Sequence, residues 1–120
     1  MNNSNNIIQS VVSEPKDGMV RVFLSRTTFQ QINQSIRARF NGGTPSLTYS
    51  SGTDASGKGI RKFTVDGIDI YSAFSRNEAG LGVNSFFISE ADAIKLEIPR
   101  YEQKEKLTVA FSADSFAEVV

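Results

Sequence analysis

The segment SSGTDASGKGIRK, residues 51–63, has most of the glycine and lysine spacing of a phosphate-binding P-loop. A P-loop places its glycine-rich turn between a strand and a helix, whose N-terminal amides meet the phosphates, and a Ser or Thr after the lysine holds magnesium. Here Gly59 follows Lys58, and the next residues, IRKFTV, alternate as a strand does. The segment is therefore predicted to connect two strands and not to bind a nucleotide as a P-loop.

Three positive charges in this segment remain as candidates for binding an anion. Lys58, Arg61 and Lys62 lie close together at its end. Backbone amides in a glycine-rich loop can form an anion-binding nest without a helix, and phosphate is the expected anion. The alternative is a solvated end of a loop, whose charges only keep the protein soluble.

A second candidate site is predicted in MVRVFLS, residues 19–25. Alternation places Arg21 and Phe23 on one face of this strand, opposite the apolar side chains of Val20, Val22 and Leu24. An arginine beside an aromatic ring on a sheet face is a common arrangement for binding single-stranded nucleic acid. Aromatic residues are more often packing residues, so a helix is expected to cover this face and Phe23 is expected in the core.

The absence of Cys and His excludes disulfides, thiolate or imidazole metal sites, and Ser–His or Cys–His catalysis. Asp66 and Asp69, together with Glu102 and Lys104, resemble in residue type the metal-binding groups of restriction-type nucleases. However, Asp66 is expected in a hairpin turn, and the segment around Glu102 alternates in charge as a solvated surface does. The protein is therefore predicted not to be an enzyme, and no cofactor or metal is expected.

The apolar patterns predict an α+β fold with a mainly antiparallel sheet of about six or seven short strands, which could curl into a partly closed barrel. One hairpin is predicted across EPKDG and a second across the dipeptide Asp66-Gly67. The predicted strands lie at residues 7–13, 19–25, 46–50, 60–65, 68–74, 83–89 and 105–111.

The principal helix is predicted at about residues 28–41, where apolar residues recur at spacings of three and four: Phe29, Ile32, Ile36 and Phe40. Its polar face carries Arg37 and Arg39, and these point in different directions, so at most one can join a given basic patch.

Helices are also predicted nearer the C-terminus. The segment EADAIKLEI, residues 90–98, follows a capping Ser89 and precedes Pro99, which is expected to stop the helix. Residues 112–120 are predicted to form a further short helix or a tail.

The length of 120 residues and the ordinary hydrophobic content indicate one domain. Residues 1–6 are expected to be a disordered leader and residues 50–59 a mobile loop. Residues 1–65 carry a net charge of +5, from eight basic and three acidic residues, and the remainder carries −5. The absence of a membrane-spanning run or a secretory signal leads us to expect a cytoplasmic protein without a membrane partner.

Two functions from different classes remain. The first is a non-enzymatic module that binds nucleic acid or another phosphate-bearing ligand, such as a phosphorylated small molecule. The second is a protein-interaction or structural module, such as an inhibitor or a homo-oligomer subunit of the kind found among phage and plasmid accessory proteins. The candidate residues for the first are Lys58, Arg61, Lys62, Arg21 and Arg39.

Overall fold

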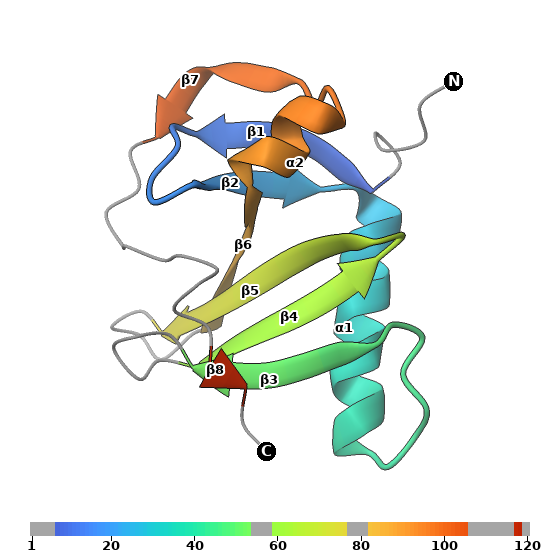
Figure 1. The fold of residues 1–120 in the computed structure, drawn as a ribbon. Coiled ribbons are helices and arrows are strands. Elements are labelled where there is room, and N and C mark those ends of the chain that lie inside the picture. Colours follow the sequence, from blue (N-terminus) through green and yellow to red (C-terminus); the bar gives the residue numbers. More distant parts are fainter. Residues whose placement is uncertain (1–6, 54–58, 77–81, 106–116, 119–120) are drawn as a thin grey trace.

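A computed structural model describes residues 7–53, 59–76, 82–105 and 117–118, which form one eight-stranded sheet with two helices (Figure 1). The helices are α1 (Arg26–Phe40) and α2 (Glu90–Lys95). The strands are β1 (Ile8–Ser13), β2 (Met19–Leu24), β3 (Tyr49–Thr53), β4 (Gly59–Val65), β5 (Ile68–Arg76), β6 (Gly82–Ser89), β7 (Arg100–Glu105) and β8 (Ala117–Glu118).

The strand order is β7-β1-β2-β6-β5-β4-β3-β8. Every neighbouring pair is antiparallel except β1 and β7, which are parallel. The predicted α+β fold with a mainly antiparallel sheet is therefore confirmed. β7 and β8 lie at opposite ends of the strand order, so the described sheet is open and does not close into a barrel.

Both predicted hairpins form, and each turns on an Asp-Gly pair. Asp66 and Gly67 have φ angles of 50° and 81°, the positive values that a two-residue hairpin turn requires. The turn between β1 and β2 is also centred on such a pair, because Asp17 and Gly18 have φ angles of 54° and 76°.

α1 begins at Arg26, two residues before the predicted start, because Ser25 caps it. The Ser25 hydroxyl accepts a hydrogen bond from the Thr28 backbone N–H at 3.2 Å. The helix ends at Phe40, and Gly42 has a φ angle of 75° just beyond it. Neither helix among the described residues has the length and apolar character needed to cross a membrane.

The main core lies on the sheet face that both helices cover. Phe63 on β4 pairs with Ile70 on β5, and Val20 on β2 pairs with Ile88 on β6. All four side chains are fully buried, together with Ile32 of α1. A smaller buried cluster is formed on the opposite face by Met19, Ile60, Tyr71 and Phe87.

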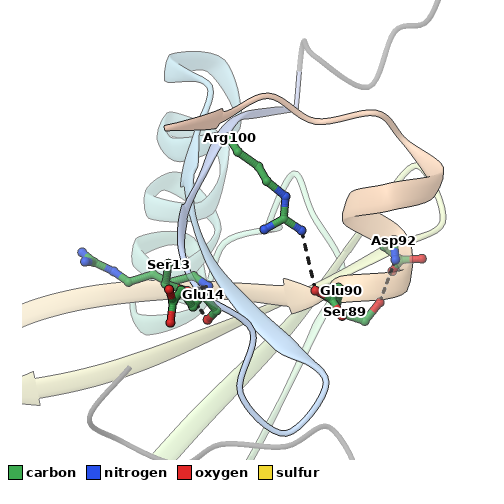
Figure 2. Close-up of polar contacts among 7 residues, drawn as sticks. Ser13, Glu14, Ser89, Glu90, Asp92 and Arg100 are labelled. Carbon is green, nitrogen blue, oxygen red and sulfur yellow. Dashed lines mark hydrogen bonds and ion pairs between the residues drawn. The ribbon is translucent and has the colours of Figure 1, made fainter. Parts of the chain in front are cut away.

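α2 follows β6 directly, and Ser89 caps it as predicted. The Ser89 hydroxyl accepts a hydrogen bond from the Asp92 N–H at 3.1 Å, and the Arg100 guanidinium pairs with the Glu90 carboxylate at 3.6 Å (Figure 2). The helix ends at Lys95 and not at the residue before Pro99 as predicted. Its end is set by Glu97, whose φ angle of 54° breaks the helical backbone earlier.

Other predicted boundaries differ from those in the structure. Residues 50–53 belong to β3 and not to a mobile loop, and the predicted strand at 46–50 starts only at Tyr49. β7 covers the charged segment 100–105, where a strand was predicted only from residue 105 onward, and Glu105 is the one residue of the predicted 105–111 strand that the structure describes. Residues 117–118 form β8, where a helix or a tail was predicted. The predicted leader 1–6, loop residues 54–58, residues 106–111 of the predicted last strand, and residues 112–116 and 119–120 of the predicted helix or tail lie outside the described residues.

β7 forms because the neighbouring strand β1 supplies backbone hydrogen-bonding partners. Its sequence, RYEQKE, has little apolar content, but β1 accepts it as a parallel edge strand. The Val11 N–H donates to the Pro99 carbonyl at 2.8 Å, which fixes the start of this pairing. Pairing along an open edge strand, and not the strand propensity of the segment, therefore decides the structure here.

Candidate anion-binding site

Two of the basic residues singled out from the sequence meet in the structure. Arg39 lies in the last turn of α1 and Arg61 in β4. Both line a surface pocket of about 310 Å³, whose other lining residues are Phe40, Tyr49 and Ser51. We call this the Arg39–Arg61 pocket.

The β3–β4 hairpin positions the sheet side of the pocket. Ser51 is directly opposite Arg61, and Tyr49 is directly opposite Phe63. Because side chains two residues apart lie on the same face of a strand, all four point to the face that α1 covers. The pocket therefore lies between the sheet and the C-terminal end of α1, which Figure 1 shows beside β3.

Arg39 reaches the pocket because of its place on the helix. Arg37 and Arg39 are separated by about 200° around the helix axis. Arg39 is directed to the sheet, where its guanidinium lies 4.9 Å from the centroid of the Tyr49 ring. Arg37 is not among the lining residues of this pocket, so only one of the two joins the site, as predicted.

The Tyr49 ring lies between the Arg39 guanidinium and the core. Tyr49 stacks on Phe63 with 4.7 Å between ring centroids and 28° between ring planes, and Phe63 is fully buried in the core. The order Phe63, Tyr49, Arg39 is therefore a stack that begins in the core and ends at the surface. A cation over an aromatic face is attracted by the ring quadrupole, so Arg39 is held in place before any ligand arrives.

The pocket is electropositive. No carboxylate is among its lining residues, and α1 contains three arginines and no Asp or Glu. Within the described part of the chain neither Arg39 nor Arg61 forms an ion pair with a carboxylate. The C-terminal end of a helix carries a negative partial charge, so the attraction for an anion must come from the two guanidinium groups.

A second hollow lies on the other side of the Arg39–Tyr49 contact. It is lined by both residues and by the α1–β3 connection, through Thr44, Pro45, Leu47 and Thr48. The connection is tied to α1: the Leu47 N–H donates to the Ser35 hydroxyl at 3.0 Å, and the Gly43 N–H donates to the Ala38 carbonyl at 2.7 Å. Threonine hydroxyls beside Arg39 add hydrogen-bond donors for an anionic ligand.

The structure places two members of the predicted cluster of Lys58, Arg61 and Lys62 on different faces of the sheet. Arg61 and Lys62 are adjacent residues of β4, so their side chains point to opposite faces of the sheet. Lys62 is opposite Tyr71 of β5, on the face away from α1. Lys58 lies outside the described residues. Arg61 and Lys62 are half-buried and lie in β4, within the strand predicted at 60–65.

Arg21 belongs to a different pocket. Its guanidinium carbon lies 5.8 Å from the centroid of the Phe23 ring. The predicted alternation of β2 is confirmed, but the expected burial of Phe23 is wrong, because its side chain is 40% exposed. This Arg21 pocket, of about 290 Å³, is lined by Gln9, Arg21, Val22, Phe23, Leu24, Phe29 and Phe86.

Sequence reasoning missed three of the residues that line the Arg39–Arg61 pocket. Phe40 was assigned to the packing stripe of α1, yet it is 82% exposed because the helix extends past the sheet at this end. Its position next to Arg39, just before Gly42 and Gly43, is the signal that marks it as a terminal residue of the helix. Tyr49 was placed in the predicted strand 46–50 and Ser51 in the predicted loop, and neither carried a local signal for a site.

The structure separates the carboxylates that resembled a nuclease site. Asp69 is on β5, where its carboxylate accepts a hydrogen bond from the Thr64 hydroxyl at 3.1 Å, while Glu102 and Lys104 are on β7. β1, β2 and β6 lie between these two strands in the sheet. Among the described residues no group of three or more carboxylates is placed to hold a metal ion.

The Arg39–Arg61 pocket is therefore the place where residues predicted from the sequence converge with a common charge. Its parts come from α1, β3 and β4, which the fold brings together through the hairpin and the α1–β3 connection. Comparisons with protein families, with curated proteins and with solved structures give no match for this chain.

Proposed function

We propose that this protein is a non-enzymatic module that binds a phosphate-bearing ligand in the Arg39–Arg61 pocket. The observation that carries the proposal is the meeting of two arginines, from elements distant in sequence, in the lining of a pocket that contains no carboxylate among the described residues. Paired arginines suit phosphate because each planar guanidinium can donate two parallel hydrogen bonds to two oxygens. We keep the expected cytoplasmic location as part of this proposal.

The other lining groups support the same ligand class. The Ser51 side chain is opposite Arg61 and offers a hydroxyl donor, while Phe40 offers an exposed ring that an organic group attached to the phosphate could contact. The stack on Tyr49 holds Arg39 in advance, so less side-chain entropy is lost when the ligand binds. The pocket thus combines charge, hydrogen-bond donors and an apolar surface.

A nuclear magnetic resonance titration with inorganic phosphate tests this proposal. Sodium chloride at matched ionic strength is the reference, and the Nε–Hε signals of Arg39 and Arg61 are followed. Both signals are expected to shift with phosphate and not with chloride. Arg61→Gln is expected to weaken binding about tenfold to a hundredfold, because a hydrogen bond to a charged group contributes roughly 1.5–3 kcal/mol.

Arg26→Gln is the matched control, since Arg26 is an exposed arginine of the same helix that lines neither hollow beside Arg39. It is expected to leave phosphate binding unchanged. If Arg26→Gln and Arg61→Gln lower the affinity equally, binding reflects general charge and the pocket is not the site. If phosphate shifts neither arginine signal, the proposal fails and the protein-interaction class becomes the alternative, with light scattering as its first test.

A further inference from the structure

Exposed aromatic rings line the Arg39–Arg61 pocket and the Arg21 pocket. In the described part of the chain the large hydrophobic side chains that are exposed are Phe23, Phe29, Phe40 and Ile94. All three phenylalanines line either the Arg39–Arg61 pocket or the Arg21 pocket. Proteins that bind single-stranded nucleic acid combine exposed rings with arginines, because bases stack on the rings and phosphates pair with the guanidinium groups.

The Arg21 pocket lies where strands β2 and β6 separate. The β2–β6 ladder ends where Val22 faces Phe86, while β6 continues along β5. Phe23 and Leu24 of β2 therefore lie beyond the last residue of β2 that pairs with β6. Phe29 of α1 packs edge-on against Phe86, with 5.9 Å between centroids and 85° between planes, and stays 43% exposed.

The two pockets lie at opposite ends of one flank of α1. Phe29 and Phe40 are eleven residues apart, which is three helical turns, so they differ by only about 20° around the axis and by about 16 Å along it. Figure 1 shows α1 running beside the strands from β2 to β3, and the ring contacts place Phe29 at β6 and Arg39 at β3.

The surface between the pockets is suited to a polyanion. Asn33 and Arg37 lie between Phe29 and Phe40 on the solvent side of this flank, and Arg26 precedes them. Arg26 and Arg37 are exposed, and α1 contains no acidic residue that would repel phosphates. We call the surface from the Arg21 pocket along this flank to the Arg39–Arg61 pocket the α1 track.

We infer that the ligand is a single-stranded nucleic acid that binds along the α1 track and contacts both pockets. This inference rests on the proposed function and names its ligand class. A mononucleotide would occupy one pocket and leave the rings at the other unused. A duplex keeps its bases stacked inside, so the exposed rings would have no base to contact. Because a stacked strand rises about 3.4 Å per nucleotide along its axis, the track spans about five nucleotides, and fewer if the strand is extended.

A length series of fluorescein-labelled oligothymidylates, measured by fluorescence anisotropy at low salt, tests the track. The series runs from roughly two to ten nucleotides, a range that brackets the span of about five. Affinity is expected to rise steeply until the strand reaches both pockets and to change little beyond that length. A blunt duplex of the longest length is expected to bind more weakly than the single strand.

Ring variants show whether the bases stack. Phe40→Ala is expected to weaken the long oligonucleotide about fivefold or more, and Phe40→Leu, which keeps an apolar side chain, is expected to lose most of the same affinity. Phe29→Ala is expected to reduce the affinity gain between short and long strands. Ile94→Ala, an exposed apolar residue of α2 outside the track, is the control and is expected to have no effect. Circular dichroism checks that each variant is folded.

The outcomes separate this inference from the proposed function. Affinity that is independent of length, or unaffected by the ring variants, overturns the track, while phosphate-induced shifts of Arg39 and Arg61 still support the pocket. Equal binding of the duplex also overturns the track. If neither phosphate nor any oligonucleotide binds, both proposals are wrong.

Discussion

Tyr49 connects the candidate site to the interior. One face of its ring contacts buried Phe63 and the other contacts the Arg39 guanidinium. Because both faces are occupied, Tyr49 positions Arg39 and leaves Phe40 as the ring open to a ligand in this pocket. Tyr49 therefore has a structural role, which is to hold the Arg39 guanidinium in position.

Ser35 has a comparable role for the α1–β3 connection. Its side chain is fully buried, its hydroxyl donates to the Gln31 carbonyl at 2.8 Å, and the same oxygen accepts from the Leu47 N–H at 3.0 Å. Ser35→Ala leaves the Leu47 N–H without this acceptor. We expect the free energy of unfolding to fall by about 1–3 kcal/mol in thermal or urea denaturation.

Ser46→Ala serves as the comparison for Ser35→Ala. Ser46 is exposed, and its hydroxyl lies 3.3 Å from that of Ser35. Its loss is expected to change stability by no more than about 0.5 kcal/mol. Equal effects of the two substitutions would show that the Leu47 hydrogen bond does not hold the connection.

At the scale of the elements, the hairpin turns and helix caps, which a few neighbouring residues specify, were predicted correctly. Asp66-Gly67 supplies the positive φ angles of a two-residue turn, and Ser25 and Ser89 supply helix caps. β3 was misplaced and β7 was not predicted, because their residues have little apolar alternation. Each becomes a strand only because a neighbouring edge, β4 or β1, offers unpaired backbone groups.

The turn at Gly67 allows a test of this local specification. Gly67 has a φ angle of 81°, and a Cβ there would meet no atom within 4 Å. Gly67→Ala therefore introduces backbone strain without a clash, and the expected loss of stability is about 1–2 kcal/mol in a denaturation experiment.

Gly59→Ala is the matched control for the turn. Gly59 also has open space around its Cα, but its φ angle is not positive. An alanine there is expected to change stability by less than about 0.5 kcal/mol. If both alanine variants unfold at the same denaturant concentration, the positive φ angle is not what specifies the hairpin.

At the scale of the whole molecule, the charges of the two chain halves are not separated into two bodies. β4, from the basic half, lies beside β5, from the acidic half. α1 nevertheless remains free of acidic residues, whereas α2 carries Glu90 and Asp92 in its first turn. The charge asymmetry of the sequence therefore appears in the structure as one basic helix, α1, and not as a basic half of the molecule.

This distribution predicts how binding depends on salt. If Arg39 and Arg61 each neutralise one phosphate of a single strand, the logarithm of the affinity should fall with the logarithm of salt concentration with a slope of about −1.4 or steeper. Anisotropy across a salt series measures this slope. Arg61→Gln should make it shallower by about 0.7, while a slope near zero would mean that the rings and not the charges provide the affinity.

The amino-acid sequence by itself determined the fold class, α1, the two hairpins and the alternation that places Arg21 and Phe23 on one face of β2, because turns, caps and alternation act over a few residues. It also identified Arg39 and Arg61 as candidates. Only the tertiary structure decided that these two meet, that Lys62 faces the other side of the sheet, and that Phe29 and Phe40 are exposed. Those outcomes depend on strand register and on where α1 lies across the sheet, and both are set by contacts between residues far apart in the chain.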